Sequence, residues 1–228
     1  MKIEYLDHMG SDITVVNAAR VSFGKRTTEL TDKDVKLINY LAKHHHISPF
    51  HHPQIQVRVT IPIFIARQLE KHVIGFAGSG DRIVLDKNEV SRRYVVDKPE
   101  FFIPTEWRNK PEGSIKQGSG DKHVTFLKGG AVIKYWTEDL FNSALMLYEQ
   151  MLEAGVAPEQ ARMVLPQATY TSWVWTGSLA AYMRVYKLRI DSHAQREIQE
   201  IAQQIKQVVE PLFPVSWKAL EAQRTDVA

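Results

Sequence analysis

The 228-residue sequence contains no cysteine. This absence excludes disulfides, thiolate zinc sites, iron–sulfur clusters and every mechanism that uses a cysteine nucleophile. Long apolar runs are also absent, since no stretch reaches the roughly 18 residues of a membrane span. Residues 1–5 lack the charged-then-apolar layout of a signal peptide. We therefore expect a cytoplasmic protein that has no membrane partner.

The sequence also lacks a large excess of charge of either sign. The chain has 29 Lys and Arg residues against 26 Asp and Glu residues, which gives a net charge of +3. A long nucleic acid usually binds a clustered basic stripe, so this small excess favours a small anionic ligand over nucleic acid. With 44% hydrophobic residues, a chain of this length can bury a full core. We expect residues 1–228 to form a single domain.

Helix and strand patterns are mixed along the chain, which predicts an α+β fold. Residues 2–6 resemble a short strand, and residues 12–20 fit either a helix or a strand. Thr31 and Asp34 have the spacing of a capping box, which predicts a helix over residues 32–44. Alternating apolar residues from Ile55 to Ile61 predict a half-buried antiparallel strand. The C-terminal half is mainly helical, with stripes starting near residues 141, 158, 178 and 194 and a strand over 169–175.

A helix is also predicted from Pro62 to about His72, because proline suits the first helical position. On such a helix Gln68, Lys71 and His72 share one face, although an exposed polar face is the commoner meaning of this pattern. Two Gly-rich segments, 75–87 and 109–121, lack periodicity and are predicted to be inserted loops. Residues 94–96 and 101–104 resemble short strands.

The run Asn-Glu-Val-Ser-Arg-Arg-Tyr over residues 88–94 concentrates one carboxylate, one hydroxyl, two guanidinium groups and one phenol. A pocket for a nucleotide base, ribose and phosphate needs that mixture of directional groups. An exposed, charged strand edge is an equally good interpretation of this run taken alone.

Five of the nine histidines lie within residues 44–52. Consecutive histidines at a helix end diverge in direction, and no carboxylate stands at a ligand spacing such as His-Glu-x-x-His, so we expect no metal. A cationic helix end that interacts with the helix dipole is one alternative. Contacts from one or two of these histidines to a cofactor or substrate are the other.

Six segments taken together resemble the family of flavin-dependent thymidylate synthases, the ThyX family. They occur in the family's order over most of the chain: AARVSF at 18–23, HISPF at 46–50, PIFIARQ at 62–68, NEVSRRY at 88–94, ARMVLP at 161–166 and LRIDSHAQ at 188–195. The chain departs from the family's Arg-His-Arg signature, because it has Lys71-His72-Val73 there. Lysine keeps the charge of arginine but loses its planar, bidentate recognition. Ser178-Leu179-Ala180 likewise replaces the family's Asn-x-Arg.

The resemblance implies an α+β fold with an antiparallel sheet and several helices, assembled as a homotetramer with shared active sites. It implies that dUMP is methylated to dTMP, with methylenetetrahydrofolate as carbon donor and FAD that is reduced by NADPH. The lack of cysteine agrees, because the other class of thymidylate synthase attacks the uracil ring with a thiolate.

The resemblance also assigns roles to individual residues. Arg189 is expected to be catalytic, contacting the uracil ring and favouring its ionised form. The expected dUMP contacts are Gln68, Lys71, Glu89, Ser91, Arg92, Arg93, Arg162 and Arg189. The expected FAD contacts are Ser22, Ser48, His72, Glu89, Ser178 and Arg184. His46 and Tyr94 are expected to border the path of folate or NADPH.

Two other functions are considered. A metal-dependent nucleotide phosphohydrolase would use the histidines of residues 44–52 with Asp32 or Glu89. A nucleic-acid-binding module would use Arg92, Arg93 and the lysine-rich loops, but the aromatic residues lie in helical stripes and form no stacking platform.

Overall fold

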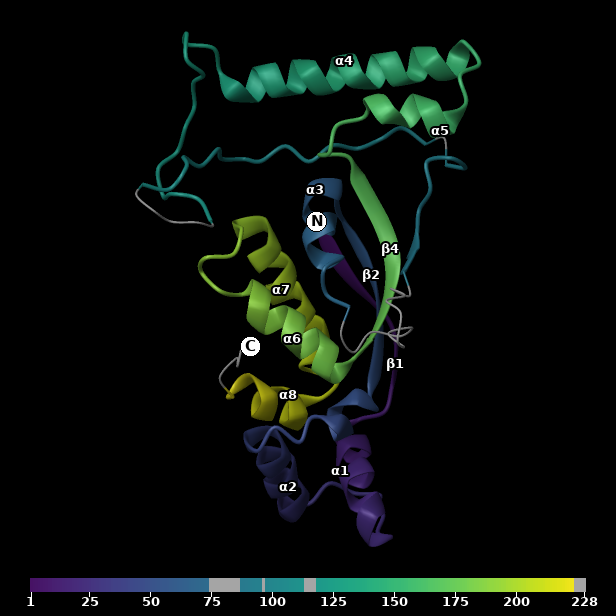
Figure 1. Cartoon of the computed structure of the whole chain (residues 1–228), viewed down its shortest axis with the longest axis vertical. Coiled ribbons are helices and arrows are strands. Elements are labelled where there is room, and N and C mark those ends of the chain that lie inside the picture. Colours follow the sequence, from purple (N-terminus) through teal and green to yellow (C-terminus); the bar gives the residue numbers. More distant parts are fainter. Residues whose placement is uncertain (74–86, 96, 113–117, 224–228) are drawn as a thin grey trace. The chain divides into compact units, whose positions relative to one another are not determined.

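The computed structural model describes residues 1–73, 87–95, 97–112 and 118–223 (Figure 1). The chain divides into two compact units. The first unit consists of residues 1–59, 68–88 and 174–228, and the second of residues 60–67 and 89–173. Of the two predicted loops, residues 75–86 and 113–117 lie outside the described residues.

The strands form one four-stranded antiparallel sheet in the order β1-β2-β4-β3. Their bounds are Lys2–Met9 for β1, Gln54–Pro62 for β2, Lys87–Glu89 for β3 and Tyr170–Ser178 for β4. In β2 the side chains of Ile55, Val57, Val59 and Ile61 are completely buried. The alternation in the sequence therefore predicted this strand correctly, and the α+β class with an antiparallel sheet is confirmed.

Eight α-helices lie within the described residues. They are α1 Asp12–Arg20, α2 Asp32–Lys43, α3 Ile63–Leu69, α4 Ile133–Glu153, α5 Pro158–Ala161, α6 Leu179–Arg189, α7 Arg196–Val209 and α8 Pro214–Glu221. Short 3-10 turns η1 Val21–Phe23, η2 Ser48–His51 and η3 Arg162–Val164 connect several of them. No helix of the described part has the length and apolar character needed to span a bilayer.

In the core of the first unit, α6 packs against both α7 and α8, and α8 also packs against α2 (Figure 1). Helix α7 places Ile198, Ile201, Ile205 and Val209 on one face, and all four are fully buried. This spacing of three and four residues is the reason that the segment folds as an amphipathic helix. Burial of each such side chain contributes about 2 kcal/mol.

Two carboxylate side chains of the first unit cap the N-termini of helices. At α2 the predicted capping box is present, with the Thr31 N–H donating to Asp34 Oδ2 at 2.9 Å. The hydrogen bond from the Thr31 hydroxyl lowers the pKa of the Asp34 carboxyl, which also lies 2.5 Å from Arg20 Nη2. At α8 the cap comes from Asp12, which accepts the N–H groups of Val215 and Ser216 at 3.0 and 2.8 Å.

The second unit contains α4 and α5. Leu145, Tyr148 and Ala161 form its buried cluster, against which Phe101 and Met151 pack. The short strands predicted at 94–96 and 101–104 are wrong where the residues are described. Ser91 to Tyr94 forms a turn, with the Tyr94 N–H bonded to the Ser91 carbonyl at 3.0 Å, and Phe101 forms only an isolated bridge to Thr169.

The helix predicted to reach His72 ends at Leu69 instead. Continued α-helix would pair the His72 N–H with the Gln68 carbonyl. That carbonyl accepts a hydrogen bond from Arg189 Nη2 at 3.2 Å, and the His72 N–H bonds to the Leu69 carbonyl at 2.9 Å. Gln68, Lys71 and His72 therefore do not share a helix face, because a tertiary contact ends the helix.

Candidate functional site

A pocket of about 390 Å³ opens in the second unit. Five of its residues come from the end of β3 and the turn after it, two from η3 and the loop after it, two from the start of β4, one from the position before β4 and one from the start of α3. Its lining consists of Ile63, Glu89, Val90, Ser91, Arg92, Arg93, Arg162, Leu165, Thr169, Tyr170 and Thr171. The Val90 N–H donates to the Ser172 carbonyl at 2.9 Å, so pairing with β4 continues to Val90, and Ser91, Arg92 and Arg93 follow after the chain has left the sheet.

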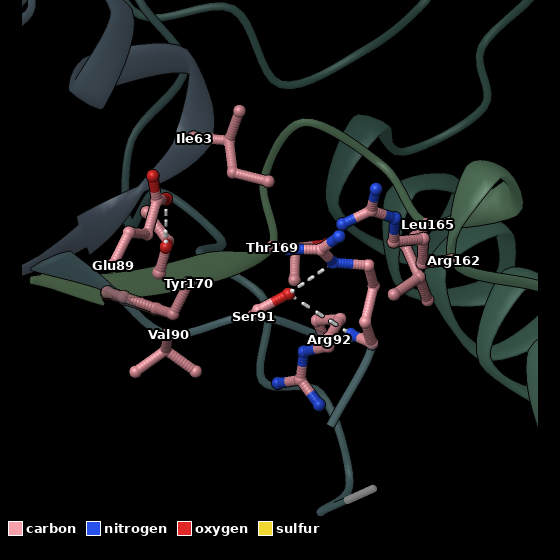
Figure 2. A pocket seen from close by; sticks show the side chains of 11 residues that line it. Ile63, Glu89, Val90, Ser91, Arg92, Arg162, Leu165, Thr169 and Tyr170 are labelled. Atoms are coloured by element: carbon pink, nitrogen blue, oxygen red, sulfur yellow. Dashed lines mark hydrogen bonds between the residues drawn. The ribbon is translucent and has the colours of Figure 1, made fainter. Parts of the chain in front are cut away.

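The polar groups of the pocket are spread along its length. Figure 2 shows Glu89 and Arg162 well apart, with Ser91 between them. Glu89 accepts a hydrogen bond from the Thr171 hydroxyl at 2.5 Å, which fixes one of its carboxylate oxygens. The pocket thus has an acidic acceptor at one end and arginine donors toward the other.

The three arginines of the pocket are oriented by neutral groups. Arg93 Nε donates to the Ser91 hydroxyl at 3.2 Å, and Arg162 Nε donates to the Glu159 carbonyl at 3.3 Å. Arg92 Nη1 donates to the Asp97 carbonyl and braces the turn. Among the described residues no carboxylate forms an ion pair with any of these three guanidinium groups. Their charge is therefore available to an anion, and the guanidinium fork matches phosphate oxygens.

A second cluster of predicted site residues lies in the first unit. Arg189, at the end of α6, donates from Nε to His72 Nε2 at 2.8 Å and from Nη2 to the Gln68 carbonyl at 3.2 Å. The Gln68 side chain donates to Gln195 Oε1 at 2.5 Å. This cluster joins the end of α3 to the end of α6.

The His72 imidazole is neutral at physiological pH. Burial, followed by the charges of Arg189 and Arg184, lowers the pKa of His72 to about 4. The unfolded chain takes up this proton below about pH 6.5, whereas the folded chain resists it until about pH 4. His72 therefore favours the folded state above that window, and this contribution is lost as the pH falls through it.

Of the remaining predicted residues, Tyr94 alone is hydrogen-bonded to a residue of either cluster within the described chain, through its N–H and the Ser91 carbonyl. Ser178 is 1% exposed and caps α6 by accepting the Ala181 N–H at 3.2 Å. Ser22, Ser48, His46, Lys71 and Arg184 are exposed in the first unit, and Tyr94 is exposed in the second, with the Arg93 guanidinium 5.2 Å from its ring centre.

Sequence analysis missed Thr169 and Thr171 as pocket residues. Both stand at or near the start of a strand rich in β-branched residues. Threonine is common in strands, so its presence there did not indicate a binding site. The pairing of β3 with β4 brings Thr171 to Glu89. Among the described residues no group of three or more His, Cys, Asp or Glu side chains could hold a metal ion.

Solved structures with the same fold include those of an enzyme that methylates nucleotides. The chain is 30% identical to "a UMP/dUMP methylase PolB from Streptomyces cacaoi bound with 5-Br dUMP", with a TM-score of 0.79 over 97% of this chain and 94% of that one. The same enzyme bound with 5-Br UMP gives a TM-score of 0.75. The fold is therefore that of a nucleotide-methylating class of enzyme.

The sequence comparisons narrow this class to one family. A family model described as "Thymidylate synthase complementing protein" matches residues 4–215. A flavin-dependent thymidylate synthase from Thermosipho africanus is 37% identical over 221 residues, covering 95% of this chain and 89% of the relative. Another, from Anaplasma marginale, is 39% identical over 215 residues, covering 93% and 69%. The chain belongs to the family of flavin-dependent thymidylate synthases.

The resemblance seen in the six sequence segments is thereby confirmed. These findings support the synthase and not the phosphohydrolase alternative. The names of the relatives imply a flavin cofactor for the family.

Proposed function

We propose that this chain makes dTMP from dUMP by reductive methylation, with methylenetetrahydrofolate as carbon donor and NADPH-reduced FAD as reductant. The arginine-lined pocket is the observation that carries this proposal, because a family member needs a site for a nucleoside monophosphate. Its volume of about 390 Å³ suits a ligand of that size. We propose further that residues 1–228 act as one functional domain in the cytoplasm, with no nucleic acid or membrane as partner.

The phosphate of dUMP is assigned to the arginine end of the pocket. Arg93 and Arg162 offer charge-assisted hydrogen bonds to phosphate oxygens, and Arg92 adds positive charge while it braces the turn. Ser91 fixes the Arg93 guanidinium and adds a hydroxyl group nearby. Glu89, held by Thr171, accepts hydrogen bonds from ligand donors at the opposite end.

The uracil ring is assigned to Arg189, with Gln68 and Lys71 as further nucleotide contacts. A fixed cation beside a developing anion stabilises that anion by several kcal/mol, on the order of 3. Arg189 is suited to this role because its two described hydrogen-bond partners are neutral, so its charge is not cancelled.

FAD is assigned to Ser22, Ser48, Glu89, Ser178 and Arg184. His72, which the family resemblance adds to this set, bonds to Arg189 and is not counted as a flavin contact. The remaining donors fit a flavin, because Arg184 supplies a cation and Ser22 and Ser48 supply exposed hydroxyl groups. Bound FAD supplies the reducing equivalents of the reaction. His46 and Tyr94, both exposed, are placed at the entry path of folate or NADPH.

The visible absorption spectrum of the FAD-saturated protein tests the proposed function. We expect flavin absorption, and we expect dUMP to shift it, because the pyrimidine and the flavin ring are proposed to be neighbours. UMP is a useful second ligand, since the similar Streptomyces enzyme was crystallised with analogues of both nucleotides. A protein that stays colourless with excess FAD, or a spectrum unchanged by dUMP, contradicts the proposal.

We propose that the enzyme is a homotetramer with FAD and dUMP sites shared between subunits. Helix α4 supports this proposal, because it carries an exposed apolar stripe on a side away from the buried Leu145 and Tyr148. Trp136, Leu140 and Leu147 are 64%, 64% and 46% exposed there. Large exposed apolar patches mark interaction sites, and a symmetric oligomer covers the same patch on every copy.

Light scattering of the purified protein should give a mass of about 104 kDa, four times the 26.1 kDa of one chain. The double variant Trp136→Glu, Leu140→Glu should lower this mass, because carboxylates cannot be buried in an apolar interface without a partner. Asn142→Glu, at an exposed polar position of the same helix, is the control. An unchanged mass for the double variant would show that α4 is not a subunit interface.

A further inference from the structure

The guanidinium group of Arg189 is anchored along one edge. Nε donates to His72 Nε2 at 2.8 Å, and Nη2 donates to the Gln68 carbonyl at 3.2 Å. Nε and Nη2 form the side edge of the arginine fork, so Nη1 points away from both anchors. Within the described residues neither hydrogen bond involves Nη1, which leaves it for a ligand.

Both anchors depend on the way the chain ends α3. Since the His72 N–H turns back to the Leu69 carbonyl at 2.9 Å, the Gln68 carbonyl is released from the helical ladder. The same tight turn buries His72 to 8% exposure with its ring against Arg189. The backbone thus presents two acceptors, one carbonyl and one imidazole nitrogen, to a single guanidinium.

The chemical identity of the imidazole matters for Arg189. Arginine only donates hydrogen bonds, so Nε2 must carry a lone pair and the ring proton must sit on Nδ1. A carboxylate in this place would hold the guanidinium more strongly, but it would also neutralise most of its positive charge. A neutral imidazole fixes the orientation and leaves the charge for the ligand. Burial lowers the pKa of His72 most, and the charges of Arg189 and Arg184, both on α6, lower it further, so the ring stays unprotonated.

We infer that His72 is a positioning residue whose Nε2 lone pair holds the Arg189 guanidinium in the orientation that meets the nucleotide. The inference rests on the proposed function, in which Arg189 contacts the uracil ring. It gives His72 a task distinct from the flavin contact that the family resemblance implies. The two tasks make different predictions about which ligand loses affinity when His72 is replaced.

Two substitutions distinguish the effect of losing the hydrogen-bond acceptor of His72 from the effect of losing its imidazole ring. His72→Gln places Oε1 as many bonds from Cβ as Nε2 is, so it preserves an acceptor for Arg189. His72→Asn is of similar polarity, but its acceptor is one bond too short. With FAD-saturated full-length protein, calorimetry should show dUMP affinity within about twofold of the wild type for His72→Gln. For His72→Asn we expect a loss of about 10-fold, the value of one hydrogen bond to a charged group.

A double-mutant cycle with Arg189→Ala supplies the decisive readout. If His72 acts only through Arg189, His72→Asn should weaken dUMP binding no further in the Arg189→Ala background. FAD affinity, from titration of the apoprotein, should change by less than about twofold in all His72 variants. A role limited to folding would instead lower both affinities together with the melting temperature, and it would do so equally with or without Arg189.

Each other outcome has a definite meaning. Additive losses in the cycle, or a loss of FAD affinity with dUMP affinity intact, would overturn the inference and favour the flavin contact. Failure of the His72→Gln rescue in a variant with a normal melting temperature would also overturn it. If the wild type binds FAD but not dUMP, the proposed function itself fails, which this experiment detects before any variant is made.

Discussion

The double variant Arg93→Gln, Arg162→Gln should bind dUMP about 100-fold more weakly than the wild type. Each guanidinium is proposed to give the phosphate at least one charge-assisted hydrogen bond worth about 1.5 kcal/mol, and two such losses amount to about 3 kcal/mol. Glutamine retains hydrogen-bonding capacity and bulk, so the loss of dUMP affinity reports the loss of the positive charge and of the guanidinium fork. Isothermal calorimetry with dUMP measures the effect.

Two controls make this result specific. Deoxyuridine lacks the phosphate, so its affinity should be the same for wild type and variant. Lys110→Gln, Lys128→Gln removes the same charge from exposed positions outside the pocket, and it should leave dUMP affinity nearly unchanged. Equal losses for deoxyuridine and dUMP would show that the arginines maintain the pocket and do not bind the phosphate.

Replacing Arg189 with alanine should lower the rate of dTMP formation by at least about 100-fold while FAD stays bound. The expected loss follows from the roughly 3 kcal/mol that a fixed cation contributes beside a developing anion. Arg189→Lys keeps the charge but cannot donate from one planar edge to both His72 and Gln68, so its rate should lie between those of the wild type and the alanine variant. Product formation in single-turnover experiments, with flavin absorbance recorded on the same sample, measures both quantities.

Normal turnover by Arg189→Ala would remove Arg189 from the chemistry. Loss of flavin together with activity would point to a structural role at the end of α6. The lysine variant guards against a third possibility, that any cation at this place is enough, because it would then match the wild type.

Sequence patterns predicted those elements whose determinants are local. The capping box of Thr31 and Asp34 set the start of α2, and the alternation from Ile55 to Ile61 set β2. Ser178 was predicted to open α6 and does so by capping it. In each case the residues that decide the structure stand within a few positions of one another.

The sequence predictions are wrong where contacts between residues far apart in the sequence determine the structure. Helix α3 ends early because Arg189, 121 positions away, takes the Gln68 carbonyl. Helix α8 was not predicted, and its cap comes from Asp12, 204 positions from Ser216. The pocket shows the same division: Glu89 to Arg93 form one run in the sequence, whereas Thr169 and Thr171 reach it only through strand pairing. Long-range contacts of this kind leave no local periodicity to recognise.

The cap that Asp12 gives to α8 also constrains the timing of folding in the cell. During synthesis the segment holding Asp12 emerges early, but the amides that satisfy its buried carboxylate appear some 200 residues later. Closing so long a loop is slow compared with forming helices, and unfinished chains expose apolar surface meanwhile. We therefore expect chains in which α8 has not yet emerged from the ribosome to remain loosely folded.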